Sequence, residues 1–415
     1  MRKWLLCISL STFLTPALWA SESFRQTQPK GQEKRPFQLP KPESFKLKNG
    51  LMVHLLRDNK LPIVSLDLTF QNGSLSDPIG MAGRADVCMT MLTRGTKKQD
   101  KIALNERLAD LGAKIYSYAS SETQGISARV LSKNYAATAK LMQTMLEEPY
   151  LRKKEFKRLI NSKLAQLKQA KGSPASLARR LENSILYGKN HPIGQVTTQK
   201  GYKKMSVADC KSYLKSTTSP ASAALFITGN ITKKKVKETF GQSKKWQGQA
   251  VILKALEEPK TPKGKIFFVD VKGAAQSYVG LRAFGPKRLS KDYFENLLLS
   301  KVYGQGFSSR INMNLREDKG YSYGARGGFT YKKHWGAFKA GSRVRGDATY
   351  TSILELLKET RDLKTSKKPV TKKELLREKE GAILSLPGKF ATSKSSLSMY
   401  KSQIHFGLDK NYFND

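Results

Sequence analysis

The order of predicted strands and helices occurs twice along this chain, and the repetition limits the folds open to it. Apolar residues at alternating or 3.6-residue spacing predict a first run at 51–56, 63–70, 80–93, 100–111, 114–119, 125–131, 134–147 and 153–171. Its order is strand, strand, helix, helix, strand, strand, helix, helix, and it continues with helices at 175–187, 206–215 and 232–240 and a strand at 223–228. The same order starts again at 266–271, 278–282, 291–303, 307–317, 321–330, 335–344, 347–363 and 371–384. The first strand of one run, 51–56, thus corresponds to 266–271 of the other, so we expect an α+β fold of two homologous domains, at 45–250 and 251–415.

The second run lacks counterparts of the helix at 206–215 and the strand at 223–228 before residue 415. A sheet without its closing strand leaves an edge uncovered. We therefore expect such an edge in the second domain, and we interpret the chain as a truncated or split gene product.

The N-terminal segment at 1–20 has the pattern of a secretory signal. Arg2 and Lys3 precede a short apolar stretch at 4–14, Pro16 interrupts it, and 18–20 offers a cleavage site. The alternative is an uncleaved N-terminal anchor, although the stretch is too short to span a bilayer as a helix. We expect a signal peptide at 1–20, a polar N-terminal arm at 21–44, and a periplasmic or secreted protein.

Two cysteines, Cys88 and Cys210, follow the predicted signal. Both fall in helical patterns, and two cysteines do not make a disulfide framework. We expect each to be buried as a small apolar residue.

The formal net charge of +42 first suggests a nucleic-acid partner. Lysines are spread along nearly the whole sequence, however, and no nucleic-acid-binding motif occurs. We expect no nucleic acid as partner. An anionic envelope surface or an acidic peptide fits an exported chain better, and a lysine-rich host proteome is the alternative explanation.

Several short motifs occur in a fixed order between Leu47 and Tyr323. They lie at 47–51, 77–82, 95–98, 111–113, 191–194, 227–230, 304–310 and 315–323. In this order the chain resembles the pitrilysin/insulinase superfamily of zinc peptidases, especially its mitochondrial-processing-peptidase-like branch. The resemblance implies two peptidase-like α/β-sandwich domains that form half of a clam-shell.

Active members of that superfamily carry His-x-x-Glu-His on their first helix and a third, carboxylate ligand on a later helix. Aligned on Gly80, the two histidine positions hold Gly83 and Val87, and the glutamate position holds Asp86. The helix expected to supply the third ligand has no Asp or Glu between Glu155 and Glu182. None of the four histidines has another histidine close to it in sequence. Asp86 and Cys88 face different sides of a helix, so we do not expect them to bind a metal ion together. We therefore expect a degenerate metal site and no cofactor on this chain.

The second half keeps Arg316 and Tyr323, close together in sequence. The resemblance implies that this pair binds substrate carbonyls and the developing oxyanion, which a guanidinium and a phenol are suited to do. In the alternative interpretation Arg316 pairs with Glu317 or Asp318, and Tyr323 is an ordinary strand residue. The resemblance also implies that the strand at 114–119 adds a peptide substrate as an extra strand.

These features predict a non-catalytic, substrate-positioning subunit of an exported heteromeric zinc metallopeptidase. The resemblance implies that zinc sits on a homologous partner subunit and that the substrate is a peptide or protein. Two alternatives remain from the sequence: a peptide- or envelope-binding module without any link to proteolysis, and a zinc peptidase that acts alone.

Overall fold

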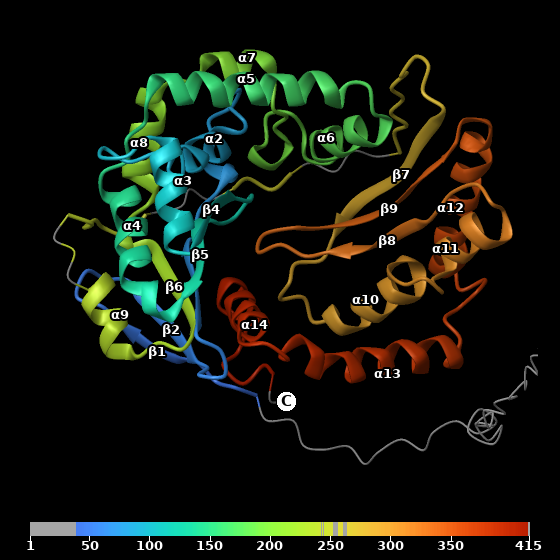
Figure 1. Cartoon of the computed structure of the whole chain (residues 1–415). Helices are drawn as coiled ribbons and strands as arrows, with labels where there is room; N and C mark the ends of the chain where they lie inside the picture. Colours follow the sequence, from blue (N-terminus) through green and yellow to red (C-terminus); the bar gives the residue numbers. More distant parts are fainter. Residues whose placement is uncertain (1–38, 242, 244, 252–255, 260–263, 414–415) are drawn as a thin grey trace, which may run out of the picture. The chain divides into compact units, whose positions relative to one another are not determined.

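The computed structural model describes residues 39–413 except for 242, 244, 252–255 and 260–263 (Figure 1). The predicted signal peptide at 1–20 and most of the predicted arm at 21–44 lie outside the described residues. Within the part of the chain that is described, no helix is both long and apolar enough to cross a membrane.

The first half of the chain builds a six-stranded sheet in the order β1-β2-β6-β3-β5-β4. Its strands are β1 (Glu43–Lys46), β2 (Met52–Arg57), β3 (Ile63–Phe70), β4 (Lys114–Ala119), β5 (Gln124–Leu131) and β6 (Ala223–Gly229). The last strand, β6, enters the middle of the sheet, parallel to β2 and antiparallel to β3. Every residue of β6 is buried, as expected for a central strand covered on both faces.

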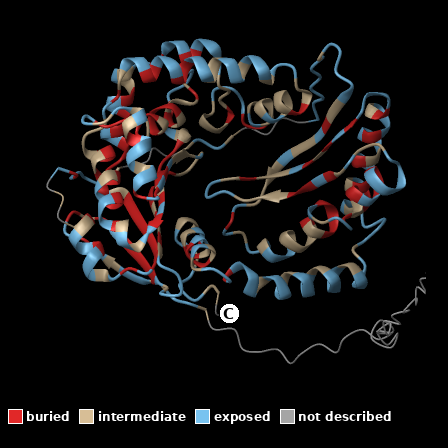
Figure 2. Cartoon of the chain, in the orientation of Figure 1, coloured by how far each residue is buried: buried red, intermediate tan, exposed pale blue. Residues whose placement is uncertain are grey.

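Most helices of the first half cover this sheet and share one apolar core with it (Figures 1 and 2). They are α2 (Arg84–Met91), α3 (Lys101–Asp110), α4 (Tyr135–Glu147), α5 (Lys153–Ala170), α7 (Gln199–Lys204), α8 (Val207–Thr217) and α9 (Lys233–Phe240). One further helix, α6 (Pro174–Tyr187), contributes no residue to this core. On β3, the alternate residues Val64, Leu66 and Leu68 are buried in this core. Burying each such side chain contributes about 1.5–3 kcal/mol, so alternation fixes which face of the strand turns inward.

The second half builds a three-stranded antiparallel sheet in the order β7-β9-β8. Its strands are β7 (Gln276–Gly285), β8 (Ala325–Thr330) and β9 (Gly336–Arg345), and its helices are α10 (Tyr293–Ser300), α11 (Arg310–Asn312), α12 (Thr349–Lys364), α13 (Lys372–Lys389) and α14 (Ser393–Phe406). Two π-helical segments, η5 (Lys301–Gln305) and η6 (Met313–Asp318), lengthen α10 and α11. A second, smaller core lies between this sheet and its helices.

The structure confirms the mixed α/β fold and most predicted elements, with two corrections. The predicted strand at 266–271 is wrong, because these residues form no strand and the apolar side chains of 266–269 are exposed. A strand needs a neighbour to satisfy its backbone groups, and none of the described strands pairs with this segment. The predicted helix at 80–93 begins only at Arg84, since Gly83 has a left-handed backbone (φ 94°).

Each half of the chain contributes a helix that packs on the sheet of the other half. The sequence offset that relates α5 to α13 also relates α6 to α14. Helix α6 lies against β7 of the second sheet, and α14 lies against β6 and β2 of the first. There, Leu397 packs on Leu56, Ala224 and Phe226. The two equivalent exchanges support the internal duplication inferred from the sequence, while the division at residue 250 remains a prediction.

Candidate functional site

The degenerate metal position lies at the start of α2. Gly83 caps this helix in a left-handed conformation that residues with a side chain rarely adopt. A Cβ atom on Gly83 would lie 3.1 Å from Thr197 Cγ2 and 3.1 Å from Tyr202 Cε1. The left-handed backbone and the close packing both disfavour a histidine at this position.

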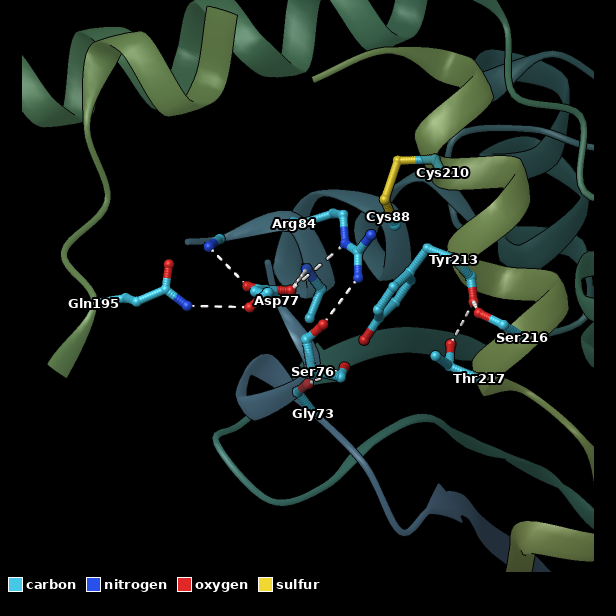
Figure 3. Close-up of polar contacts among 12 residues, drawn as sticks. Gly73, Ser76, Asp77, Arg84, Cys88, Gln195, Cys210, Tyr213, Ser216 and Thr217 are labelled. Atoms are coloured by element: carbon cyan, nitrogen blue, oxygen red, sulfur yellow. Dashed lines mark hydrogen bonds and ion pairs between the residues drawn. A yellow bond between two sulfur atoms is a disulfide. The ribbon is translucent and has the colours of Figure 1, made fainter. Parts of the chain in front are cut away.

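A buried carboxylate, Asp77, holds the first turn of α2 in place (Figure 3). Its Oδ2 accepts a hydrogen bond from the backbone N–H of Gly83 and its Oδ1 one from Ala85, both at 2.9 Å. The Arg84 guanidinium lies 3.9 Å from Oδ1, and the side-chain amide of Gln195 donates to the Asp77 carbonyl. Burial raises the pKa of Asp77 to about 6. The sequence does not indicate this role, because Asp77 lies six residues before the N-cap residue Gly83 and reaches the helix start only through the fold of the intervening turn.

The remaining positions of the motif are also occupied in ways that exclude a metal ion. Val87 is fully buried in the first core. Asp86 forms an ion pair with Lys163 of α5, the helix on which the third ligand was expected. A zinc ion does not fit here, since neither histidine position offers a ligand: one has no side chain and the other is apolar. Among the described residues, no group of three His, Cys, Asp or Glu side chains is arranged to bind a metal.

The expectation that Cys88 and Cys210 are separate buried residues is wrong. They form a disulfide that links α2 to α8, with Cα atoms 4.9 Å apart (Figure 3). Both cysteines are buried, as expected, and the apolar face of α2 that carries Cys88 packs into the first core. The pairing could not be read from the sequence, because the two cysteines lie far apart along the chain and only the crossing of α2 and α8 brings them together.

Two of the histidines, His54 and His405, make structural contacts within the fold. His54 on β2 stacks on Phe226 with ring centroids 4.9 Å apart, and burial lowers its pKa to about 4. His405 on α14 lies 3.1 Å from the Glu122 carboxylate. Neither histidine is positioned with further ligands for a metal ion.

Arg316 and Tyr323 lie in and just after the π-helical segment η6, and both are accessible. Arg316 Nε lies 3.1 Å from the Glu317 carboxylate, with both side chains 40% exposed, and its guanidinium stacks on Phe307 at 4.8 Å. Tyr323 is 92% exposed, and its hydroxyl has no hydrogen-bond partner among the described residues. The contact with Glu317 is the one named in the alternative interpretation of Arg316. No described hydrogen bond or ion pair joins Arg316 and Tyr323 to each other or to Gly83, Asp86 or Val87.

Strand β4, the predicted peptide-binding strand, lies at one edge of the first sheet. Its only strand partner within the described residues is β5, so one row of its backbone N–H and C=O groups is free to pair with an added strand. Tyr116 on β4 is an exposed aromatic residue at this edge.

Two family models match consecutive parts of the chain. The model described as "Insulinase (Peptidase family M16)" matches residues 52–195, and the model described as "Peptidase M16 inactive domain" matches residues 204–382. The chain belongs to the insulinase, or M16, family. The resemblance seen in the sequence is thereby confirmed, although this M16 chain holds glycine and valine where active members hold histidines.

Relatives of this M16 chain include both a named protease and a named non-peptidase from one organism. The chain is 23% identical over 291 residues to "Zinc protease PqqE" of Helicobacter pylori, which covers 68% of this chain and 65% of that protein. It is 24% identical over 360 residues to "Non-peptidase homolog YmxG" of the same strain, which covers 85% of this chain and 81% of that protein.

A solved structure has the same fold. The "peptidase M16 inactive domain from Pseudomonas fluorescens" superimposes with a TM-score of 0.80 at 22% identity, over 90% of each chain. At this identity the likeness concerns the fold, and it confirms the predicted α+β architecture.

Proposed function

We propose that this M16 protein is the non-catalytic, substrate-positioning subunit of an exported heteromeric zinc metallopeptidase that processes peptides or proteins. One observation carries the proposal. The positions of the zinc motif hold a glycine at the helix N-cap, a buried valine and an aspartate that is paired with Lys163. The helix is thus retained as a packed structural element that carries no metal. A subunit of this kind needs a partner for the chemical step.

Arg316 and Tyr323 are the residues that we assign to substrate positioning. The Arg316–Glu317 contact is half exposed, and such ion pairs contribute only about 0–1 kcal/mol. Arg316 can therefore leave Glu317 for a peptide carbonyl at little cost. The free hydroxyl of Tyr323 adds a second donor. Both groups would be most useful where negative charge develops during peptide hydrolysis.

The free edge of β4 supplies a second contact for the substrate. An extended peptide that pairs with an edge strand gains main-chain hydrogen bonds that do not depend on its sequence. The Tyr116 side chain beside this edge offers apolar contact to alternate residues of the peptide.

The partner that we propose is a homologous M16 subunit that carries the zinc ligands. The two Helicobacter pylori relatives support this pairing, because one organism holds both a zinc protease and a non-peptidase homologue that are similar to this chain. The signal pattern at 1–20 and the Cys88–Cys210 disulfide support export, since disulfides persist mainly in oxidising compartments.

Co-purification of the protein from its host, followed by metal analysis of each subunit, tests this function. We expect a zinc-bearing M16 partner in a 1:1 complex, peptidase activity of the complex, and no stoichiometric zinc on this chain. Isolation of the chain without such a partner would favour the peptide-binding module instead. Stoichiometric zinc on the chain alone would overturn the proposal.

A further inference from the structure

Strands β3, β5 and β4 share one face that the helices of the first core do not cover. Side chains alternate between the two faces of a sheet, and the strand registers place Ser65, Arg129 and Lys114 in one row across these strands. Apolar residues of the same strands, such as Leu66 and Ile115, turn to the opposite face and into the first core. Helix α14 lies on the β6 and β2 part of the uncovered face, on the other side of the sheet from α3 and α4 (Figure 1).

Two like charges lie directly opposite each other on this uncovered face. Lys114 and Arg129 are paired residues of the neighbouring strands β4 and β5, and both side chains are exposed. Cross-strand pairs of like charge destabilise a sheet. Neither side chain forms an ion pair with any described residue, so the two positive charges are uncompensated.

The single carboxylate that these three strands contain is already engaged. Asp67 of β3 accepts hydrogen bonds from the Tyr118 and Thr69 hydroxyls through one oxygen. Its other oxygen binds the Lys401 ammonium of α14 at 2.8 Å. Helix α14 itself contains lysines and a histidine but no acidic residue. The side chains of β3, β4, β5 and α14 therefore offer the two cations no free carboxylate.

A charged edge strand can also serve only to prevent two sheets from joining. Lysine on an edge strand is a common device of that kind, and Lys114 alone would fit this explanation. Arg129 does not fit it, because β5 is an inner strand that pairs with both β3 and β4 and has no edge to protect. A second exposed cation in register with the first favours recognition of a negative charge.

We propose that the edge of β4 selects extended peptides that carry an aspartate or glutamate beside Lys114 and Arg129. The inference rests on the proposed function, which assigns this edge to the substrate. A peptide strand added to β4 turns every second side chain to the uncovered face, so a carboxylate can lie in the row of the two cations. Its charge relieves their repulsion, whereas a lysine or arginine there would add to it. The substrate class is an acidic peptide segment in extended conformation.

Charge also argues against two other occupants of this edge. The sequence at 21–38 contains more basic than acidic residues. A second copy of the chain that paired through its own β4 would bring another Lys114 and Arg129 to the joint sheet. Both occupants would increase the repulsion that an acidic peptide removes.

Binding of three synthetic heptapeptides to the full chain, without a zinc-bearing partner, tests the inference. Each peptide alternates valine and threonine, with valine at both ends, and the central residue is glutamate, glutamine or lysine. We expect the glutamate peptide to bind at least threefold more tightly than the glutamine peptide and at least tenfold more tightly than the lysine peptide, measured by fluorescence anisotropy. It should also slow hydrogen exchange of the β4 amides. The preference should shrink as the salt concentration rises, because exposed charges are screened.

Matched variants give the expected side-chain dependence. The double variant Lys114→Gln with Arg129→Gln should bind the glutamate and glutamine peptides equally, and Lys114→Glu with Arg129→Glu should prefer the lysine peptide. Lys140→Gln removes an exposed lysine of α4, on the other side of the sheet, and should leave the preference unchanged. All three side chains are exposed in the free protein, so these variants should fold.

The outcomes separate this inference from the proposed function. Equal binding of the three peptides with protection of β4 would overturn the acidic preference and leave the proposed function intact. A glutamate preference that persists in the double glutamine variant, or protection away from β4, would mean that the general positive charge of the chain binds the peptide, and would overturn the assignment to Lys114 and Arg129. Full activity of an Arg316→Ala complex, a separate measurement, bears on the proposed function alone.

Discussion

Arg282 on β7 occupies the position in the second sheet that Asp67 on β3 occupies in the first, under the same offset that relates 51–56 to 266–271. Asp67 binds Lys401 of α14 at 2.8 Å, and Arg282 binds Glu182 of α6. Glu182 and Lys401 occupy equivalent places on the exchanged helices, counted from the first residue of each helix. The duplication has thus kept the ion pair and reversed its polarity.

A tyrosine hydroxyl completes each of these pairs. Tyr118 donates to Asp67 and accepts from Lys401, both at 2.8 Å. Tyr278 donates to Glu182 at 3.2 Å and accepts from Arg282 at 2.8 Å. Each helix is therefore fixed to the other half's sheet by a partly buried cluster of hydrogen bonds.

We expect the Glu182–Arg282 pair to stabilise the fold measurably. A double-mutant cycle with Glu182→Gln and Arg282→Met should give a coupling free energy of about 1–3 kcal/mol in urea unfolding, because both side chains are mostly buried. The exposed Arg345–Asp347 pair serves as control and should give no measurable coupling. Equal couplings for the two pairs would contradict this account.

The Arg310–Glu374 pair predicts a loss of stability in acid. Two hydrogen bonds from Arg310, at 2.7 and 2.8 Å, hold the pKa of Glu374 at about 2, below its ordinary value of 4.5. The pair therefore contributes its full stability above pH 4.5 and loses it as the pH falls toward 2. Glu374→Gln should lower the free energy of unfolding by about 2–3 kcal/mol at pH 7 and by much less near pH 2. Glu380→Gln, on the exposed face of the same helix, should have no effect at either pH.

The Cys88–Cys210 disulfide should be a major source of stability. It closes a long loop, and cross-links of this kind stabilise by about 3–5 kcal/mol in the chain-entropy description. We expect Cys88→Ala with Cys210→Ala to lower the urea midpoint strongly, and reductant to have no further effect on that variant. An unchanged midpoint, or free thiols in the exported protein, would contradict the pairing.

Gly83 and Gly80 provide a matched test of the degenerate metal position. Both have positive φ angles, 94° and 83°, but only Gly83 is closely packed, against Thr197 and Tyr202. Gly80→Ala should cost about 1 kcal/mol from backbone strain alone, and Gly83→Ala should cost more because its Cβ meets those neighbours. Thermal unfolding of the two variants measures the difference. A milder effect at Gly83 would mean that the position still has room for a ligand.

Strong local patterns made much of the fold predictable. Helices α5 and α6 and strands β4 and β5 lie very close to their predicted bounds, because their apolar spacing is regular and a proline or glycine marks an end. Helix α14 was not predicted, since its serine-rich sequence has few apolar residues and its burial depends on the other half.

The candidate site was predictable only where residue identity alone decides the outcome. The absence of histidines at Gly83 and Val87 could be read directly. Three other features of the site could not be predicted, because they depend on how elements meet in space. They are the Asp86–Lys163 ion pair, the disulfide and the hydrogen bonds from the start of α2 to Asp77. The segment 266–271 has the composition of a strand, but composition cannot supply the neighbour that a strand needs.

The most direct test of the central claim is the activity of the complex reconstituted from this chain and its zinc-bearing partner. We expect Arg316→Ala to lower kcat/KM about 100-fold while the zinc content of the complex and its assembly stay unchanged. Arg345→Ala, which removes an exposed arginine elsewhere, should leave kcat/KM within twofold. Full activity of the Arg316→Ala complex would contradict the substrate-positioning role.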